Sequence, residues 1–206
     1  MIWTRIVRVP QMTGKIDKKS HSKVLIPLFA KGIILQREYI LLLLSGEKGT
    51  AMTFRFAEEV DCTLILRFIR GLADYEKMSD QVVATEELLR EWIFVKKKAE
   101  VLFICVDDKE VGFALFFHNF STFLGRAGIY LEDLFVLPEY RNKGYGKALL
   151  KKLAQITVSR GCGRLEWACL DWNKPSIEFY KSLGAEVMDE WTTYRLTGDT
   201  LMEMAK

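Results

Sequence analysis

Hydrophobic positions from Thr53 onward recur with the periods of strands and helices in alternation. The segment Thr53–Phe56 alternates polar and apolar residues and predicts a strand. Asp61 precedes apolar residues spaced three and four apart, so we predict a helix with Asp61 as its N-cap. Those apolar residues are Leu64, Ile65, Phe68, Ile69 and Leu72. Thr85 opens a second helix, which runs through Trp92.

The remaining pattern predicts a hairpin, three further strands and two further helices. The polar turn of the hairpin is residues 107–110. The hairpin strands are 101–106 and 111–117, the further strands are 129–136, 164–169 and 191–196, and the helices are 144–160 and 175–183. This order predicts an α/β domain with a mixed sheet. One strand, 129–136, leads through a glycine turn into a long amphipathic helix.

Residues 1–51 differ from the rest of the chain in charge and in pattern. They hold nine Lys/Arg against three Asp/Glu, whereas residues 52–206 hold 21 against 24. Residues 24–44 are apolar, but Pro27 and three charged residues interrupt them, which argues against a membrane span or a secretory signal. We expect residues 1–51 to be a basic extension outside the native fold, with Met52 as the initiator. The alternative is a genuine extension in which Ile33–Leu44 packs as an extra helix or strand.

Composition narrows the chemistry that residues 52–206 can perform. Half of the whole chain is apolar and 28% is charged, which is typical of a soluble globular protein. The slight acidic excess of residues 52–206 argues against nucleic-acid binding. The four cysteines form neither a CxxC pair nor a zinc-type spacing, so we expect no metal site and a reducing, cytoplasmic location. With only two histidines, acid–base chemistry is expected to use carboxylates or tyrosine.

The segment Leu134–Ala148 runs from a strand end into a helix start and contains Gly144 and Gly146. Glycines at these positions allow a tight turn, and a helix N-terminus attracts anions. We therefore expect a pyrophosphate group as the ligand. The basic side chains of Arg141 and Lys147 would add positive charge.

Two other phosphate-binding motifs do not fit this turn. A Walker loop needs glycine where Arg141 stands and Ser or Thr where Ala148 stands. A dinucleotide fingerprint needs a third glycine where Leu149 stands.

The spacing Arg-x-x-Gly-x-Gly after Val-Leu-Pro-Glu-Tyr resembles the acetyl-coenzyme A loop of the GNAT acyltransferase superfamily. A second match is the segment Leu170–Ala185, since GNAT enzymes place an Asn before this helix and a Phe-Tyr pair near its end. The segments 72–77, 130–133 and 170–173 resemble the branch of diamine (spermidine/spermine) and thialysine N-acetyltransferases. The resemblance covers nearly all of residues 52–206 and none of the first 51.

The resemblance implies a GNAT fold, whose central sheet is mixed and mostly antiparallel with flanking helices, and it implies acetyl-coenzyme A as acyl donor. It also implies that the β-strand backbone at Leu134–Val136 binds the pantetheine arm and polarises the acetyl carbonyl. The residues expected to hold the cofactor are Leu134, Phe135, Val136, Arg141, Asn142, Lys143, Gly144, Tyr145, Gly146, Lys147, Asn173, Lys174, Pro175, Ser176 and Tyr180.

By the same resemblance, Glu132 removes a proton from the substrate amine and Tyr180 protonates the departing thiolate. The residues expected to bind substrate are Tyr75, Glu76, Glu132, Asp133 and Glu166. Without the resemblance, the pattern predicts that Glu132 and Asp133 are exposed acids on a strand. It likewise predicts that Tyr180 is a half-buried core residue. The diamine branch carries an acid where this chain has Thr192, with Glu190 displaced from that position.

We therefore expect a cytoplasmic, homodimeric N-acetyltransferase that acts on a primary amine of a small cationic metabolite, a polyamine or a lysine-like amino acid. Two alternatives remain. A protein or peptide N-acetyltransferase would present an open groove instead of an acidic pocket. A non-catalytic acyl-coenzyme A sensor would not need both Glu132 and Tyr180.

Overall fold

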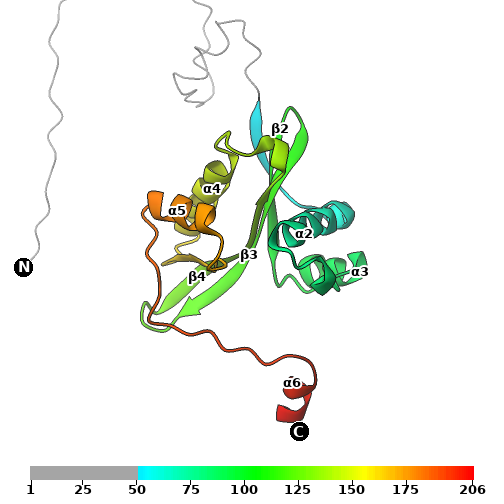
Figure 1. The fold of residues 1–206 in the computed structure, drawn as a ribbon, viewed down its shortest axis with the longest axis vertical. Helices are drawn as coiled ribbons and strands as arrows, with labels where there is room; N and C mark the ends of the chain where they lie inside the picture. Colours follow the sequence, from blue (N-terminus) through cyan, green and yellow to red (C-terminus); the bar gives the residue numbers. More distant parts are fainter. Residues whose placement is uncertain (1–50) are drawn as a thin grey trace, which may run out of the picture. The chain divides into compact units, whose positions relative to one another are not determined.

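The computed structural model describes residues 51–206, which form a sheet with helices on both faces (Figure 1). The strands are β1 (Met52–Phe56), β2 (Glu100–Val106), β3 (Lys109–Ser121), β4 (Arg126–Val136) and β5 (Leu165–Trp167). The helices are α2 (Cys62–Glu76), α3 (Glu86–Leu89), α4 (Tyr145–Ser159), α5 (Lys174–Ser182) and α6 (Gly198–Met204). Short turns are η1 (Glu59–Asp61), η2 (Ser79–Gln81) and η4 (Pro138–Tyr140), and η3 (Arg90–Val95) is π-helical. The prediction about residues 1–51 falls outside the described residues, apart from Ala51, and stays a prediction.

The five strands of the described chain lie in sequence order across one sheet. The pairs β1–β2, β2–β3 and β3–β4 are antiparallel, and β4–β5 is parallel. The β2–β3 turn is tight, with Asp107 and Asp108 both at positive φ (49° and 60°). This arrangement confirms the prediction of an α/β fold with a mixed, mostly antiparallel sheet.

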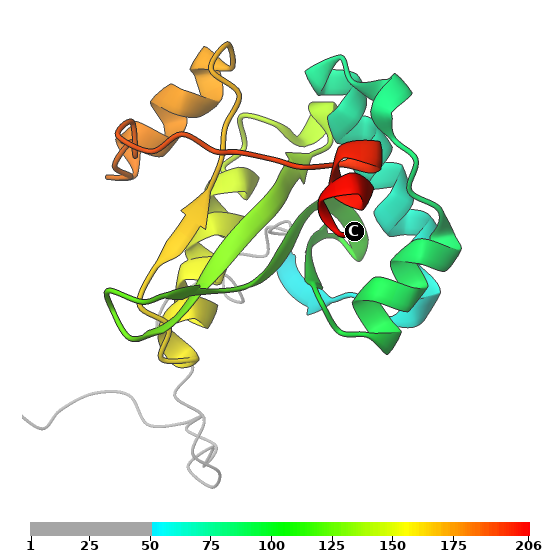
Figure 2. The same ribbon diagram turned by 90° about the horizontal axis from the view of Figure 1, so that it is seen from below.

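Each face of the sheet carries its own apolar core, because alternate side chains of a strand point to opposite faces. One core joins α2 and the α3–η3 helix to the sheet; in it, Phe68 stacks on Phe113 with ring centroids 5.2 Å apart and meets Phe135 edge-on at 6.4 Å. The other core packs α4 against the opposite face and includes Leu149 and Leu153. Figure 2 shows the two helical layers on either side of the sheet.

Most of the predicted elements are confirmed, with shifts of a few residues at their ends. Strand β5 is shorter than predicted, since only residues 165–167 pair with β4. Asp61 does stand at the N-cap of α2, but its carboxylate makes no capping bond to that helix. It instead accepts two hydrogen bonds from Arg55, at 2.7 and 2.9 Å, and one from the Glu58 N–H. The predicted cap is thus a link between β1 and the start of α2.

The predicted last strand, 191–196, is wrong for the described chain, because these residues pair with no strand. Their alternation of apolar and polar residues has strand propensity, but a strand forms only where a neighbour satisfies its N–H and C=O groups. All residues from 186 to 206 are exposed. The short helix α6 in this segment was not predicted.

Candidate active site

The loop between β4 and α4 is shaped to receive an anion. Gly144 is the N-cap residue of α4 with φ +83°, and no side chain caps the helix. The first-turn N–H groups of a helix have no partner within the helix, so here they remain available to a ligand. A Cβ built on Gly146 meets no other atom within 4 Å, so the backbone lies open at this point. These features fit the pyrophosphate of coenzyme A.

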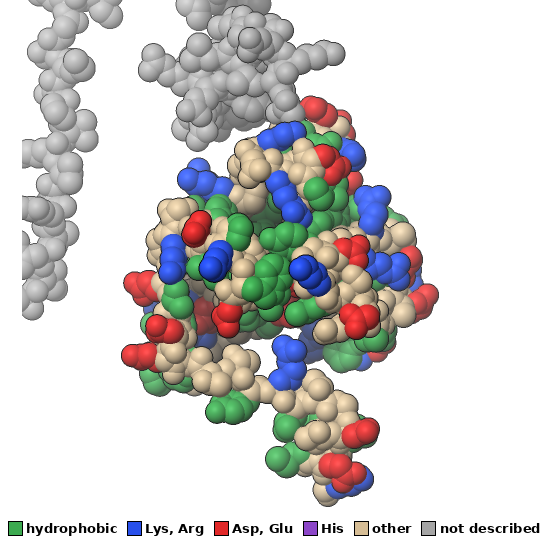
Figure 3. Space-filling view, viewed as in Figure 1, with side chains coloured by type: hydrophobic (Ala, Val, Ile, Leu, Met, Phe, Trp, Pro, Cys, Tyr) green, Lys and Arg blue, Asp and Glu red, His purple; other side chains and the backbone are tan. Residues whose placement is uncertain are grey.

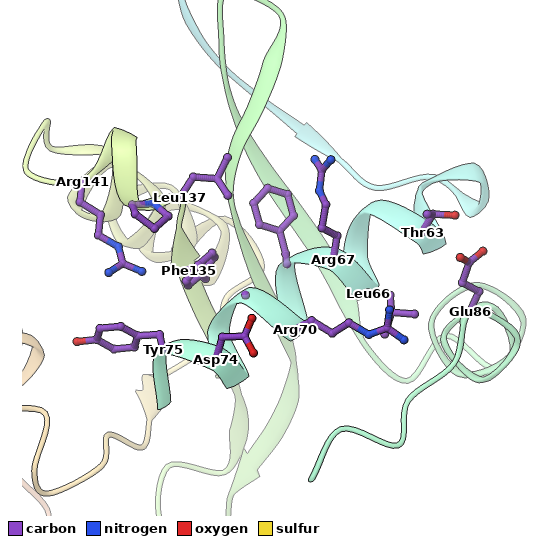
Figure 4. A pocket seen from close by; sticks show the side chains of 13 residues that line it. Thr63, Leu66, Arg67, Arg70, Asp74, Tyr75, Glu86, Phe135, Leu137 and Arg141 are labelled. Atoms are coloured by element: carbon purple, nitrogen blue, oxygen red, sulfur yellow. The ribbon is translucent and has the colours of Figure 1, made fainter. Parts of the chain in front are cut away.

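Arg141 in this loop turns toward α2. Its Nε donates to the carbonyl oxygen of Val136 at 3.0 Å. Its guanidinium lies 4.7 Å from the ring centroid of Tyr75 and 5.2 Å from that of Phe135. Figure 4 shows the Arg141 side chain turned toward Tyr75. Arg141 thereby fixes the loop to the end of β4 and to the C-terminal end of α2. Lys143 has a similar local role, with its Nζ 5.2 Å from the Tyr140 ring.

Strands β4 and β5 separate soon after they meet. Their pairing covers only Ile129–Leu131 against Leu165–Trp167. Beyond Leu131, the edge of β4 that faces β5 has no strand partner up to Val136. The backbone at Leu134–Val136 therefore has no strand partner on this edge and is open to an extended ligand, which fits the arm of coenzyme A.

A β-bulge in β4 separates the two neighbouring acids, Glu132 and Asp133. Leu131 pairs with Phe116 and Asp133 pairs with Leu115, so Glu132 is the extra residue without a partner. The Glu132 side chain is exposed and Asp133 is half-buried. Burial, followed by the negative charges of Glu132 and Glu76, raises the pKa of Asp133 to about 7. The enclosed acid is therefore Asp133.

Helix α5 supplies the tyrosine predicted to be the general acid. Tyr180 packs against Trp167 of β5, with ring centroids 5.1 Å apart. Burial raises the pKa of Tyr180 to about 12, with smaller contributions from Cys169, Glu76 and Tyr75. The phenol is consequently protonated at neutral pH and able to donate.

Hydrogen bonding joins the C-terminal end of α2 to the start of α5. The Tyr75 hydroxyl donates to Oδ1 of Asn173 at 3.1 Å, and the same oxygen accepts the Ser176 N–H at 3.4 Å. Trp172 lies against Tyr75, with ring centroids 6.2 Å apart. Burial raises the pKa of the adjacent Glu76. Tyr75, Glu76 and Asn173 are thus held beside the separation of β4 and β5.

Glu166 has close polar partners of its own on the sheet. Its Oε2 lies 2.7 Å from Nε of Arg164 and accepts a hydrogen bond from Nδ2 of Asn119 at 2.7 Å. The positive charge of Arg164 offsets much of the negative charge that Glu166 was expected to offer a substrate. Neither Arg164 nor Asn119 was singled out from the sequence, because no motif marks them. Glu190 and Thr192 lie in the exposed C-terminal segment.

An open cleft of about 680 Å³ lies between α2 and the end of β4 (Figure 4). Three predicted site residues line it, namely Tyr75, Phe135 and Arg141, whereas Tyr180 and Glu132 do not. The cleft therefore lies on the α2 side of the predicted catalytic residues Glu132 and Tyr180, beside them. In the view of Figure 3, hydrophobic side chains gather at the middle of this face, with Lys and Arg side chains around them.

The remaining predicted cofactor residues follow the same two loops. Asn142 has positive φ (59°) before Gly144, and Tyr145 and Lys147 lie in the first turn of α4. Lys174 and Pro175 open α5. Within residues 51–206, no cluster of three His, Cys, Asp or Glu side chains is placed to hold a metal ion. No helix in that range is long and apolar enough to cross a membrane.

Gly146→Val is expected to weaken coenzyme A binding by at least tenfold while the fold is kept. A side chain at this position meets no protein atom, so it would obstruct only a ligand that approaches the backbone. Calorimetry with coenzyme A measures the effect, and Ala154→Val, at an exposed position later in α4, is the matched control. Unchanged affinity in Gly146→Val would place the phosphate site elsewhere.

Comparison with known proteins identifies the family. The Acetyltransferase (GNAT) family profile matches residues 67–185. A thialysine N-epsilon-acetyltransferase from Bos taurus is 42% identical over 163 residues, covering 73% of this chain and 95% of the relative. An L-ornithine N5-acetyltransferase from Arabidopsis thaliana is 48% identical over 95 residues, which are 46% of this chain and 42% of that protein. A solved integron cassette protein from V. cholerae superposes with a TM-score of 0.66 at 29% identity, covering 77% of this chain and 99% of that one.

These matches confirm the resemblance that the glycine turn and the Asn and Phe-Tyr motifs indicated. The profile runs from within α2 to just beyond α5, so it contains both the anion-binding loop and Tyr180. The chain belongs to the GNAT acetyltransferase family, whose members take their acetyl group from acetyl-coenzyme A.

Proposed function

We propose that the protein acetylates a terminal primary amine of a small cationic metabolite, either a lysine-like diamino acid or a polyamine. The observation that carries this proposal is the group of acids at the separation of β4 and β5, formed by Glu76, Glu132 and Asp133 near Tyr180. Negative charge at this point attracts a cationic chain. The names of the relatives, a thialysine and an ornithine acetyltransferase, support the same substrate class.

The residues of the site can meet the three demands of acetyl transfer to an amine. Bound acetyl-coenzyme A supplies the activated acetyl thioester. The free edge of β4 can donate an N–H to the acetyl oxygen and so polarise the carbonyl. A carboxylate can take a proton from the amine, which arrives as ammonium because its pKa is near 10. Tyr180 can give a proton to the sulfur that departs.

The two alternative functions find less support. A peptide substrate would need an open groove that reaches the acids and Tyr180, whereas the open cleft beside α2 is lined by neither Glu132 nor Tyr180. A sensor that only binds acyl-coenzyme A would have no use for a half-buried acid beside a protonated tyrosine. Burial of the acid costs stability without helping to hold the cofactor.

A substrate screen tests the proposal. Thialysine, ornithine, lysine, putrescine, spermidine and a lysine-containing peptide would each be offered with acetyl-coenzyme A, and thiol release would be measured. We expect kcat/KM to be at least tenfold higher for one of the small amines than for the peptide. A preference for the peptide, or hydrolysis of acetyl-coenzyme A without amine acetylation, would overturn the proposal.

Tyr180→Phe is expected to keep coenzyme A binding and to lose roughly 10²–10⁴-fold in kcat. The change removes one hydroxyl and keeps the ring that packs against Trp167. Single-turnover kinetics and calorimetry on the same sample separate chemistry from binding, with Tyr194→Phe in the exposed segment as control. Unchanged single-turnover rates would remove Tyr180 from the mechanism.

We also propose that the protein is a cytoplasmic homodimer. The four free thiols are consistent with a reducing compartment. The C-terminal segment exposes several large apolar side chains, among them Trp191 at 70% and Tyr194 at 90%, and a second copy would cover them. Light scattering should give twice the monomer mass for the wild type and a lower mass for Trp191→Ser/Tyr194→Ser. A monomeric wild type would overturn this assignment.

A further inference from the structure

The sheet face under α2 continues beyond the apolar core that the helix covers. That core contains Phe113 of β3 and, at its margin, Leu115. Because alternate residues of a strand share a face, the same face continues through Phe117 and Asn119. Both of these side chains are half-buried. This part of the sheet is therefore only partly covered by the described chain.

Tyr130 of β4 lies at the centre of this uncovered part. It pairs with Phe117 of β3 on one side and with Glu166 of β5 on the other. The Phe117 and Tyr130 rings pack together, with their centroids 5.3 Å apart. Burial and then the negative charges of Glu132 and Glu166 raise the pKa of Tyr130, whereas the positive charge of Arg195 lowers it. Charges of both signs therefore act on the Tyr130 hydroxyl.

Gly128 of β4 leaves room for the side chains of its two neighbours. A Cβ on Gly128 would meet Cγ of Arg164 at 2.8 Å and would also collide with Oδ1 of Asn119. Both side chains thus lie over this glycine, on the face that Tyr130 shares. The Asn119 Nδ2 donates a hydrogen bond to Glu166 at 2.7 Å. We refer to Asn119, Tyr130, Arg164 and Glu166 as the polar patch.

Arg164 and Glu166 present opposite charges side by side in the polar patch. Nε of Arg164 lies 2.7 Å from a carboxylate oxygen of Glu166, and the two side chains are 34% and 32% exposed. Nη2 of Arg164 donates to the carbonyl oxygen of Phe120 at 3.4 Å, and Nη1 has no hydrogen-bond partner within residues 51–206. A guanidinium has five N–H donors. Donors of Arg164 therefore remain for a second carboxylate.

The polar patch begins next to the predicted reaction centre. Strands β4 and β5 separate one residue after the pair of Tyr130 and Glu166. Glu132, the acid expected to receive the proton of the amine, lies two residues beyond Tyr130. Trp167, which follows Glu166, packs against Tyr180. Two residues of a strand cover about 7 Å, which is comparable with the length of a lysine side chain.

We propose that Arg164 and Glu166 bind the α-carboxylate and the α-ammonium group of an amino acid, so that the substrates are lysine-like diamino acids and not polyamines. This assignment rests on the proposed amine acetylation and decides between the two substrate classes named there. Arg164 binds the carboxylate and Glu166 binds the α-ammonium group. The terminal amine then extends along β4 to Glu132, which keeps the role expected from the family resemblance.

The charges of the pair match those of an α-amino acid. A diamino acid carries a carboxylate and an ammonium group on one carbon atom, and Arg164 and Glu166 offer the complementary charges at adjacent positions. A guanidinium binds a carboxylate through two parallel N–H bonds. A polyamine has only positive groups, so Arg164 repels it. A site built for a carboxylate also rejects an analogue that lacks one, because its donors are then left unpaired.

Analogues that lack one of the two α-groups test this assignment in the wild type. Cadaverine is lysine without its carboxylate, 6-aminohexanoate is lysine without its α-amine, and all three keep the terminal amine. We expect kcat/KM for lysine to exceed that for either analogue by roughly tenfold or more, since each analogue loses a charged hydrogen bond. Ornithine and putrescine repeat the comparison with a shorter chain. In the pair that the enzyme uses better, equal values for the diamine and the diamino acid would overturn the proposal.

Arg164→Gln should raise KM for the diamino acid and reduce its advantage over the diamine by roughly tenfold. Arg164→Lys should restore part of this preference, because it returns the charge without the planar fork. Arg126→Gln is the matched control, since Arg126 is an exposed arginine near the start of the same sheet region. An equal loss with both substrates in a folded Arg164→Gln protein, as judged by circular dichroism, would show a structural role and contradict the proposal.

Glu166→Gln gives a separate check on the contact with the α-ammonium group. It should reduce the preference for lysine over 6-aminohexanoate by roughly tenfold, because the amide that replaces the carboxylate carries no charge. The preference for lysine over cadaverine should change less, since Arg164 still binds the carboxylate. An unchanged preference over 6-aminohexanoate would argue against this contact.

A binding measurement distinguishes this proposal from the proposed function. Calorimetry with lysine and with cadaverine, on protein saturated with coenzyme A, requires no acetyl transfer. We expect roughly tenfold tighter binding of lysine, and loss of this difference in Arg164→Gln. Equal affinities would overturn the role of the polar patch even where an amine is acetylated. If lysine binds more tightly and no amine is acetylated, the proposed function fails instead.

Discussion

Parallel pairing between β4 and β5 stops after three residues on each strand, and the active site depends on this early separation. A longer pairing would satisfy the backbone of Leu134–Val136 within the sheet and leave nothing for an extended cofactor to bind. Each face of β4 belongs to one of the two apolar cores, with α2 packed on one face and α4 on the other. The backbone groups left open by the separation are therefore fixed before any ligand arrives, which is the condition for an effective donor to a developing oxyanion.

The separation also brings distant parts of the chain to one place. Tyr75 at the end of α2 donates to Asn173 at the start of α5, and Arg141 lies over the same tyrosine ring. Two loops, β4–α4 and β5–α5, are thereby tied to one aromatic side chain at the end of α2. The acids enclosed beside it are costly for the free protein, because burial without a cationic partner disfavours their charged forms. A bound ammonium group would offset part of that cost.

The sequence predicts the framework of the fold well and its irregularities poorly. Regular periodicity identifies β2, β3, α2 and α4, and the glycine turn before α4 follows from local chemistry at Gly144. The failures occur where tertiary partners decide the outcome. Residues 191–196 have strand propensity without a strand partner in the described chain, and Asp61 bonds Arg55 instead of capping its own helix. Of the predicted site residues, the loop glycines and Tyr180 could be found from motifs, but the partners of Glu166 could not.

The bulge in β4 shows why the different environments of Glu132 and Asp133 could not be predicted from the sequence. Neighbouring residues of a regular strand face opposite sides of the sheet, so the choice between them depends on the register with β3. That register changes between Leu115 and Phe116, where one extra residue of β4 is accommodated. Nothing in the sequence of β4 itself marks Glu132 as the extra residue. Because the bulge directs Glu132 to solvent, it leaves Asp133 to follow the alternation that continues through Phe135, on the face that α2 encloses.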